Sequence, residues 1–94
     1  MIIVSGTIRT TPGQRQRFLD ASLKAMTMAR AAQGCMAFIV AADPIVDDLV
    51  NVYEQWESEA AMLAFRGDGP SDEMGSMIAH TDVQRHQVSA TGPA

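Results

Sequence analysis

The sequence predicts an α+β protein of the ferredoxin-like type, with the element order β-α-β-β-α-β and an antiparallel four-stranded sheet. Four segments with strand-like patterns alternate with segments of helical periodicity. Only a short turn separates the second and third strand segments, so these two form an antiparallel hairpin. Right-handed crossovers then place both main helices on one face of the sheet.

Length and composition indicate one small domain. The chain has 94 residues, a net charge of −4 and a hydrophobic content of 47%. We expect the domain to span residues 1–90 and residues 91–94 to form a flexible tail. The seven Lys and Arg residues are scattered, so they form no basic stripe for nucleic acid. The longest apolar run, residues 35–42, is too short to cross a membrane. We therefore expect a cytoplasmic protein that binds neither nucleic acid nor membrane.

The first strand covers residues 1–9 and leads into a helix start. One face of this strand consists of Ile2, Val4, Gly6 and Ile8. Thr11 and Gln14 form a predicted capping box, and Pro12 suits the first helical position. We therefore expect the first helix to begin directly after Thr11.

This first helix runs to Gln33 in our prediction, because Gly34 is typical of the position that follows a helix. Its apolar stripe consists of Phe18, Leu19, Ser22, Leu23, Ala25, Met26 and Ala29. Its charged residues, expected to face water, are Arg15, Arg17, Asp20, Lys24 and Arg30.

The second and third strands differ in how their faces are built. Residues 35–42 are apolar on both faces, and the turn chemistry of Asp43 and Pro44 follows them. The third strand ends at Ser58 and carries the only Trp and the only Tyr of the chain. One face consists of Val50, Val52, Glu54 and Trp56. The other consists of Leu49, Asn51, Tyr53 and Gln55.

The last third of the chain contains a helix, a break, a short helix and a strand. Ser58 can cap a helix over residues 59–66, whose inner side is formed by Ala61, Met62 and Phe65. Residues 67–70 break this helix, and Ser71 can cap a short helix that reaches Ile78. The fourth strand is predicted over residues 81–89.

The apolar second strand predicts self-association. In this topology it lies at a sheet edge, and the chain's own helices can cover only one of its faces. A two-fold homodimer, sheet against sheet, would bury the other face and form a dimeric α+β barrel.

Three stretches resemble the antibiotic biosynthesis monooxygenase family: Gly34-Cys35 at a strand start, Asp43-Pro44 after that strand, and residues 53–62. The most specific feature is the pattern Glu54-x-Trp56-x-Ser58. The resemblance covers most of the chain and implies dimeric α+β barrels of ferredoxin-like subunits. The family includes cofactor-free quinol-forming oxygenases, haem-degrading enzymes and small-molecule isomerases.

Three positions depart from patterns that the resemblance implies. Many members place a His near the end of the second helix, where this chain has Arg66. Oxygenase members pair the Trp with an Asn on the same strand face, whereas Asn51 is five residues from Trp56 and points to the opposite face. Haem-degrading members use an Asn in the first strand, where this chain has Gly6. Haem degradation is therefore the least supported of the family's activities.

Each candidate catalytic residue has two interpretations. Trp56 could stack on a flat aromatic substrate, or close the layer between helices and sheet. Glu54 could act as a buried base, or form a structural hydrogen bond to a backbone amide or to Arg66. Arg66 could hold an anionic oxygen, or be a solvated helix-end cation beside Glu59 or Asp68. The predicted substrate-binding residues are Trp56, Phe65, Met62, Met74 and Met77.

The remaining reactive side chains are expected to be structural. The spacing of His80 and His86 does not suit a metal pair, and we expect a rim or dimer contact from His86. Cys35 in an apolar strand is expected to be an inert packing residue, and as a single cysteine it forms no internal disulfide.

The sequence therefore supports two hypotheses of function. The first is a cofactor-independent monooxygenase, without metal, acting on a small aromatic or quinol-type substrate in a pocket between sheet and helices. The alternative is a non-catalytic homodimer that binds a small hydrophobic ligand or serves an accessory role. A third and weaker hypothesis is isomerisation of a small polar metabolite.

Overall fold

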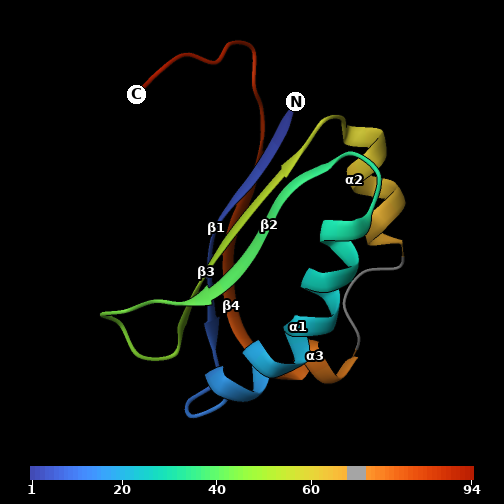
Figure 1. Ribbon diagram of the computed structural model, residues 1–94. Coiled ribbons are helices and arrows are strands. Elements are labelled where there is room, and N and C mark those ends of the chain that lie inside the picture. The colour runs from blue at the N-terminus through green and yellow to red at the C-terminus, as the bar shows by residue number, and fades with distance from the viewer. Residues whose placement is uncertain (68–71) are drawn as a thin grey trace.

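The computed structural model describes residues 1–67 and 72–94 and confirms the predicted α+β fold. The elements, in chain order, are β1 (Ile2–Thr10), α1 (Arg15–Ala31), β2 (Cys35–Ala42), β3 (Leu49–Trp56), α2 (Glu59–Arg66), α3 (Asp72–Ser76) and β4 (Ile78–Gln87). Figure 1 shows α1 and α2 on one side of the sheet. The cap predicted at Ser71 falls outside the described residues. No helix in the described ranges is long and apolar enough to cross a membrane.

The four strands form one antiparallel sheet in the order β2-β3-β1-β4. This order confirms that β2 lies at an edge. β1 is central: it pairs with β3 from Ile2 opposite Trp56 to Arg9 opposite Leu49, and with β4 on its other side. Directly opposed residues of an antiparallel pair share a face, so this register fixes which side chains meet the helices.

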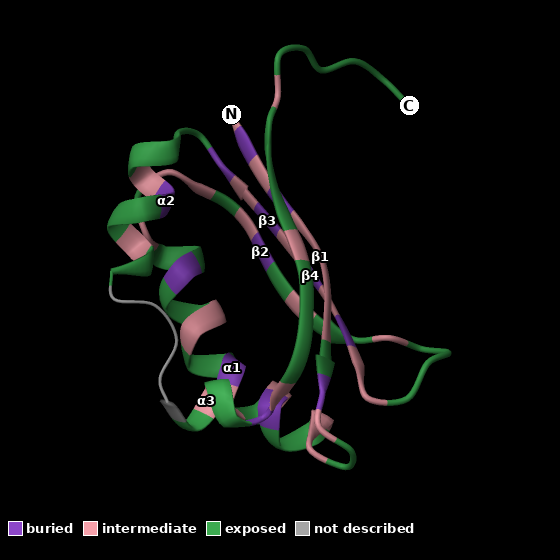
Figure 2. Cartoon of the chain, turned by 180° about the vertical axis from the view of Figure 1, so that it is seen from behind, coloured by how far each residue is buried: buried purple, intermediate pink, exposed green. Residues whose placement is uncertain are grey.

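The core lies between the sheet and the helices. Val50, Val52, Glu54 and Trp56 of β3 are all buried, and their alternate neighbours are half-buried, as the period-two pattern predicts. Figure 2 marks the buried residues on the strands and on the sides of α1 and α2 that face the sheet. Two clusters share this layer. The first contains Ile2, Val4, Ala29, Phe38, Trp56 and Met62, and the second contains Phe18, Val50, Val52 and Met77. We call the first the tryptophan cluster and the second the Phe18 cluster.

The start of α1 differs from the prediction. The helix begins at Arg15, and Gln14 occupies the N-cap position without a side-chain capping bond. Gln14 N–H instead donates to the carbonyl of Thr11 at 3.1 Å. The reason is Gly13, whose φ of 76° lies in the left-handed region and is incompatible with a helix. Leu23, predicted in the buried stripe, is 59% exposed. The predicted capping box and the place of Leu23 were therefore wrong.

The boundaries of α3 and β4 also differ from the prediction. α3 ends at Ser76, and β4 runs from Ile78 to Gln87 rather than over residues 81–89. The cause is tertiary: β1 pairs with β4 along its whole length, from Ile2 opposite Gln87 to Thr10 opposite Ile78. Pairing with a central strand overrides the polar composition of this segment.

At Gly6 the backbone of β1 closely approaches that of β4. Its φ is 150°, and a Cβ at this position would overlap the carbonyl oxygen of Asp82 on β4. Only glycine fits such a contact. An Asn at this position of the first strand, which the family resemblance associates with haem degradation, would meet the same obstacle.

The turn between β2 and β3, residues 43–48, is organised by the carboxylate of Asp43. Its Oδ2 accepts the N–H groups of Ile45 and Val46 at 3.1 and 2.8 Å, and its Oδ1 accepts a hydrogen bond from Asn51 at 2.9 Å. The hydrogen bond from Asn51 and those from Val46 and Ile45 hold the pKa of Asp43 below its ordinary value of 3.8.

Arg15 fastens the same turn to the start of α1. Its Nη1 donates to the carbonyl oxygens of Asp43, Val46 and Leu49 at 3.2, 3.0 and 3.2 Å. Arg15 was expected to face water, but its guanidinium reaches three carbonyl oxygens, two in the turn and one at the start of β3. The turn is therefore fixed from both the sheet and the helix.

We predict that Gly6→Ala lowers the free energy of unfolding by roughly 3 kcal/mol, because the new Cβ forces β1 and β4 apart. Gly75→Ala is the matched control, since a Cβ there meets nothing within 4 Å. This control should be neutral or stabilising by up to about 1 kcal/mol. Urea unfolding of both variants measures the difference, and equal stabilities would contradict the account.

We also predict that the Asp43 carboxylate stabilises the turn at all pH values above its unfolded pKa. This contribution is lost as the pH falls through the lower folded pKa. Asn51→Ala should move the Asp43 midpoint upward, toward 3.8, because it removes the largest cause of the shift. NMR titration of the Ile45 and Val46 amide protons measures the midpoint. Gln84→Ala, an exposed polar residue of β4, should leave the midpoint unchanged.

Candidate functional site

The candidate site is built on the end of β3, where a buried acid and a buried indole lie side by side. Glu54 and Trp56 are two residues apart and therefore share the face of the strand that meets the helices. Trp56 is fully buried, and Glu54 is 7% exposed. The indole Nε1–H donates to Glu54 Oε1 at 3.0 Å. The site thus holds a carboxylate inside an apolar layer.

Arg66 supplies the cation nearest to this carboxylate. It ends α2, and its Nη2 lies 3.5 Å from Glu54 Oε1. The arginine side chain is 43% exposed, so water screens this ion pair and its contribution to stability is small. The predicted hydrogen bond between Glu54 and Arg66 is confirmed. Glu59, the alternative partner proposed for Arg66, pairs instead with Arg85 at 3.0 Å, and Asp68 lies outside the described residues.

Two phenylalanine rings pack against the indole and against each other. Phe65 packs on Trp56 with ring centroids 5.5 Å apart, and Phe38 meets both rings edge-on at 6.5 and 5.8 Å. Phe38 comes from β2, Trp56 from β3 and Phe65 from α2, so the cluster ties three elements together. Such edge-to-face contacts are the arrangement that aromatic quadrupoles favour.

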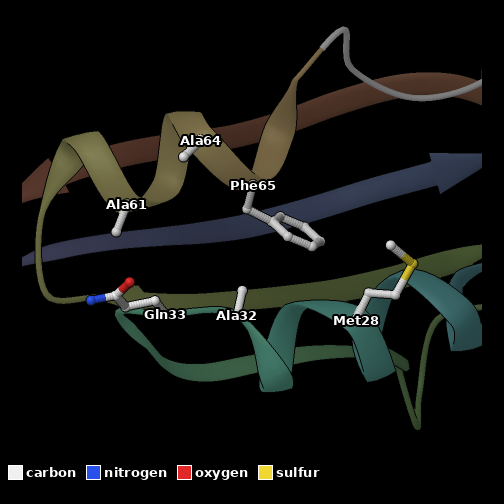
Figure 3. Close-up of a pocket in the computed structure, with 6 residues that line it drawn as sticks. All are labelled: Met28, Ala32, Gln33, Ala61, Ala64 and Phe65. Carbon is white, nitrogen blue, oxygen red and sulfur yellow. The ribbon is translucent and has the colours of Figure 1, made fainter.

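A groove of about 370 Å³ lies between α1 and α2, beside this cluster. Its lining consists of Met28, Ala32, Gln33, Ala61, Ala64 and Phe65. Figure 3 shows the Phe65 ring pointing from α2 toward α1, with the Met28 side chain opposite. The Gln33 amide is the polar side chain among these residues. The groove therefore suits a flat apolar molecule with one hydrogen-bonding group.

The structure brings only some of the predicted site residues to this groove. Phe65 lines it directly, whereas Trp56 lies behind Phe65 with its N–H committed to Glu54. Met62 is fully buried within the tryptophan cluster. Met77 belongs to the Phe18 cluster, and Met74 packs against that cluster. The roles of these residues toward a substrate stay predictions, but Met74 and Met77 do not share a cluster with Trp56.

Sequence reasoning missed most of the groove lining. Met28, Ala32, Gln33 and Ala64 were not singled out, because their selection depends on how closely α1 approaches α2. Small residues on both helices are the signal that could have indicated this approach. Ala61 was assigned to the inner side of α2, which its half-buried position confirms.

The remaining reactive side chains lie away from the groove. His80 and His86 are exposed on β4, where they oppose Arg9 and Ile3 of β1. Burial raises the pKa of the half-buried Cys35 thiol, which makes it less reactive. Asn51 points away from Trp56, as predicted, and bonds Asp43. Across the described residues, no three His, Cys, Asp or Glu side chains gather as a metal site would require.

A second hollow, of about 400 Å³, lies at the other end of α1. It is lined by Gly13, Arg15, Gln16, Asp47 and Asp48, so its character is polar. Arg15 is already occupied by the carbonyls of the β2–β3 turn. We therefore interpret this hollow as part of the surface around the turn and not as a ligand site.

Comparison with known proteins gives a match to one family and to several solved structures. Residues 1–74 match the family model described as antibiotic biosynthesis monooxygenase. A putative antibiotic biosynthesis monooxygenase from Deinococcus radiodurans superposes with a TM-score of 0.86 at 15% identity, covering 100% of this chain and 98% of that one. One from Chloroflexus aurantiacus superposes at 0.75 with 24% identity, covering 97% and 96%.

A protein from Pseudomonas aeruginosa also superposes, with a TM-score of 0.78 at 17% identity, covering 95% of this chain and 94% of that one. At these identities the structural matches show a shared fold. A comparison with curated proteins gives no match.

We predict that the Trp56–Glu54 hydrogen bond couples the two residues by about 1.5–3 kcal/mol, the range for hydrogen bonds to charged groups. Trp56→Phe should cost more stability in the natural chain than in a Glu54→Leu background, where no carboxylate loses its donor. Urea unfolding followed by far-UV circular dichroism measures all four chains. Gln55→Leu, on the opposite face of β3, is the control background and should give additive costs. Additivity with Glu54→Leu would contradict the coupling.

Proposed function

Because this chain belongs to the antibiotic biosynthesis monooxygenase family, we propose that it is a cofactor-independent monooxygenase acting on a small aromatic or quinol-type substrate. The proposed binding place is the groove between α1 and α2. The observation that carries the proposal is the buried Glu54 carboxylate, which is hydrogen-bonded to Trp56, the ring on which Phe65 of the groove packs. Ionisable groups in an apolar layer beside a groove are common at sites of proton transfer.

The proposed reaction needs only proton removal and positioning from the protein. A phenol gives its O–H proton to a base, and the phenolate passes one electron to O2. The resulting radical and superoxide combine at the ring carbon para to the oxygen. The peroxide is protonated and then loses water, which leaves a quinone. One O2 thus yields one quinone and one water.

The roles of the side chains follow from their places in the cluster. Phe65 is half-buried, and displacement of its ring by a substrate would open the groove toward Trp56 and Glu54. In this proposal Glu54 accepts the proton, Trp56 stacks on the ring, and Arg66 stabilises the negative oxygen. A base must come within about 3 Å of the proton that it accepts, so this movement is a requirement of the mechanism.

A second candidate function is binding of a small hydrophobic ligand without turnover. It is favoured by the groove itself, because none of its lining residues titrates. Alanine, methionine and phenylalanine side chains can hold an apolar molecule but cannot move a proton. Under this alternative, Glu54 and Arg66 serve only the stability of the core.

We further propose that the functional unit is a homodimer formed sheet against sheet. The family is typically dimeric. The face of the sheet opposite the helices carries Ile39, which is 45% exposed. Met36, whose sulfur accepts a hydrogen bond from Gln55 of that face, is 59% exposed. Burial of such apolar side chains is the main favourable term in association.

We predict that the protein consumes O2 with 1-naphthol as the probe, and that Glu54→Gln lowers kcat by about 10²–10⁴, the usual contribution of a general base. Ala64→Trp should fill the groove and raise KM by at least about tenfold. Ala60→Trp is the matched control, because Ala60 is exposed on the same helix and does not line the groove. Oxygen-electrode assays measure both constants.

Quenching of the single Trp fluorescence separates the two candidate functions. Isothermal calorimetry measures binding to the Ala64→Trp variant. If the natural chain binds the probe without consuming O2, and Ala64→Trp abolishes this binding, the ligand-binding function is favoured. If the protein shows no binding and no O2 consumption, both proposed functions of this groove are contradicted.

A further inference from the structure

The β2–β3 turn presents the most exposed large apolar side chain among the described residues. Ile45 at its tip is 88% exposed, and the adjacent Val46 is 41% exposed. In Figure 1 this turn extends beyond the body of the molecule, away from α2 and the groove. A single exposed Ile is not unusual in itself. The informative feature is the set of hydrogen bonds that holds the turn on which Ile45 lies.

The turn is held in place by hydrogen bonds from its own Asp43, from Arg15 of α1 and from Thr10 of β1. Asp43 and Arg15 together make four hydrogen bonds to its N–H and carbonyl groups, and Arg15 also bonds the carbonyl of Leu49 at the start of β3. Asp48 adopts a left-handed φ of 59°. Its carbonyl accepts from Thr10 N–H at 2.8 Å, and its side chain accepts from Gly13 N–H at 3.2 Å. The fold thus fixes an apolar tip in water, at the cost of a strained residue.

Fixing a tip in advance favours binding, because the ordering entropy is already lost before a partner arrives. The turn is also continuous with the open face of the sheet, the face opposite the helices. Asn51, which holds Asp43, lies on that face opposite Thr7 of β1. Ile39 and Tyr53 are opposed to each other on the same face. The base of the turn that carries the apolar tip therefore adjoins the open face.

Charge indicates that a second copy of this chain is a suitable occupant. The turn carries three acidic residues, and Asp47 at its tip is exposed and makes no ion pair within the described parts of the chain. The open face carries Arg9, which is exposed and likewise makes no ion pair there. A two-fold arrangement would bring each acidic turn to a face that carries a free cation.

We propose that the β2–β3 turn is a clasp, and that Ile45 and Val46 of each subunit pack on the open sheet face of the other. This inference rests on the sheet-against-sheet dimer proposed above. Each dimer contains two clasps, so a change at the tip acts twice. The contact lies on the opposite side of the sheet from the groove, which separates association from ligand binding.

The test compares dimer dissociation for two exposed apolar residues. Ile45→Asp should raise the dimer Kd by about 100-fold or more, because two apolar tips are replaced by charges. Leu63→Asp is the matched control: Leu63 is 53% exposed on α2, on the helical side of the sheet. Its dimer Kd should remain that of the natural chain. Sedimentation velocity over a dilution series measures Kd, and circular dichroism verifies that both variants are folded.

A second variant tests rigidity rather than apolar surface. Arg15→Ala removes the three hydrogen bonds of the guanidinium and leaves Ile45 and Val46 in place. It should raise Kd by about tenfold, because the freed turn must be ordered on association. Arg17→Ala, an exposed neighbour on α1, should have no effect.

The outcomes separate the clasp from the dimer and from the enzyme. A natural chain that stays monomeric at micromolar concentration would overturn both the dimer and the clasp. A natural dimer with equal Kd values for Ile45→Asp and Leu63→Asp would overturn the clasp and leave the dimer standing. O2 consumption by the natural chain reports on the proposed activity independently of the Kd values of the variants.

Discussion

The hydrogen bond from the Trp56 indole to the Glu54 carboxylate is the interaction on which the rest of the structure depends. A carboxylate at 7% exposure costs several kcal/mol unless donors surround it. The indole supplies one donor at 3.0 Å, and Arg66 supplies a longer one. Because the Trp56 ring also packs on Phe65 of α2, the acid and the indole link the end of β3 to that helix. The groove beside α2 inherits its shape from this constraint.

The same constraint explains why the aromatic residues gather at one end of the sheet. Phe38, Trp56 and Phe65 exclude water from the carboxylate, and in a drier environment its hydrogen bonds are stronger. Arg66 is nevertheless 43% exposed, so the cluster keeps one polar connection to solvent. In the proposed reaction such a connection lets a proton that Glu54 takes from a substrate leave again.

Local patterns predicted the parts of the fold that local physics decides. The faces of β3 and the Ser58 cap, which accepts Ala61 N–H at 3.1 Å, follow from residue spacing alone. The late start of α1 does not, because Gly13 prefers a turn that is completed by Asp48, 35 residues away. The limits of β4 depend on β1, and the groove depends on the approach of α1 to α2. For the site, sequence predicted the Glu54–Arg66 contact but not that Phe65 would stand between Trp56 and the groove.

Asn51 shows how the two faces of the sheet divide their tasks. The family resemblance implies an Asn beside the Trp in oxygenase members, yet here the amide lies on the other face and holds Asp43 at 2.9 Å. A strand's side chains alternate, so an odd spacing of five residues from Trp56 removes this group from the groove altogether. The Asn51 amide instead holds the turn that carries Ile45. Separate sets of residues therefore build the groove on the helical side of the sheet and the turn beside its open face.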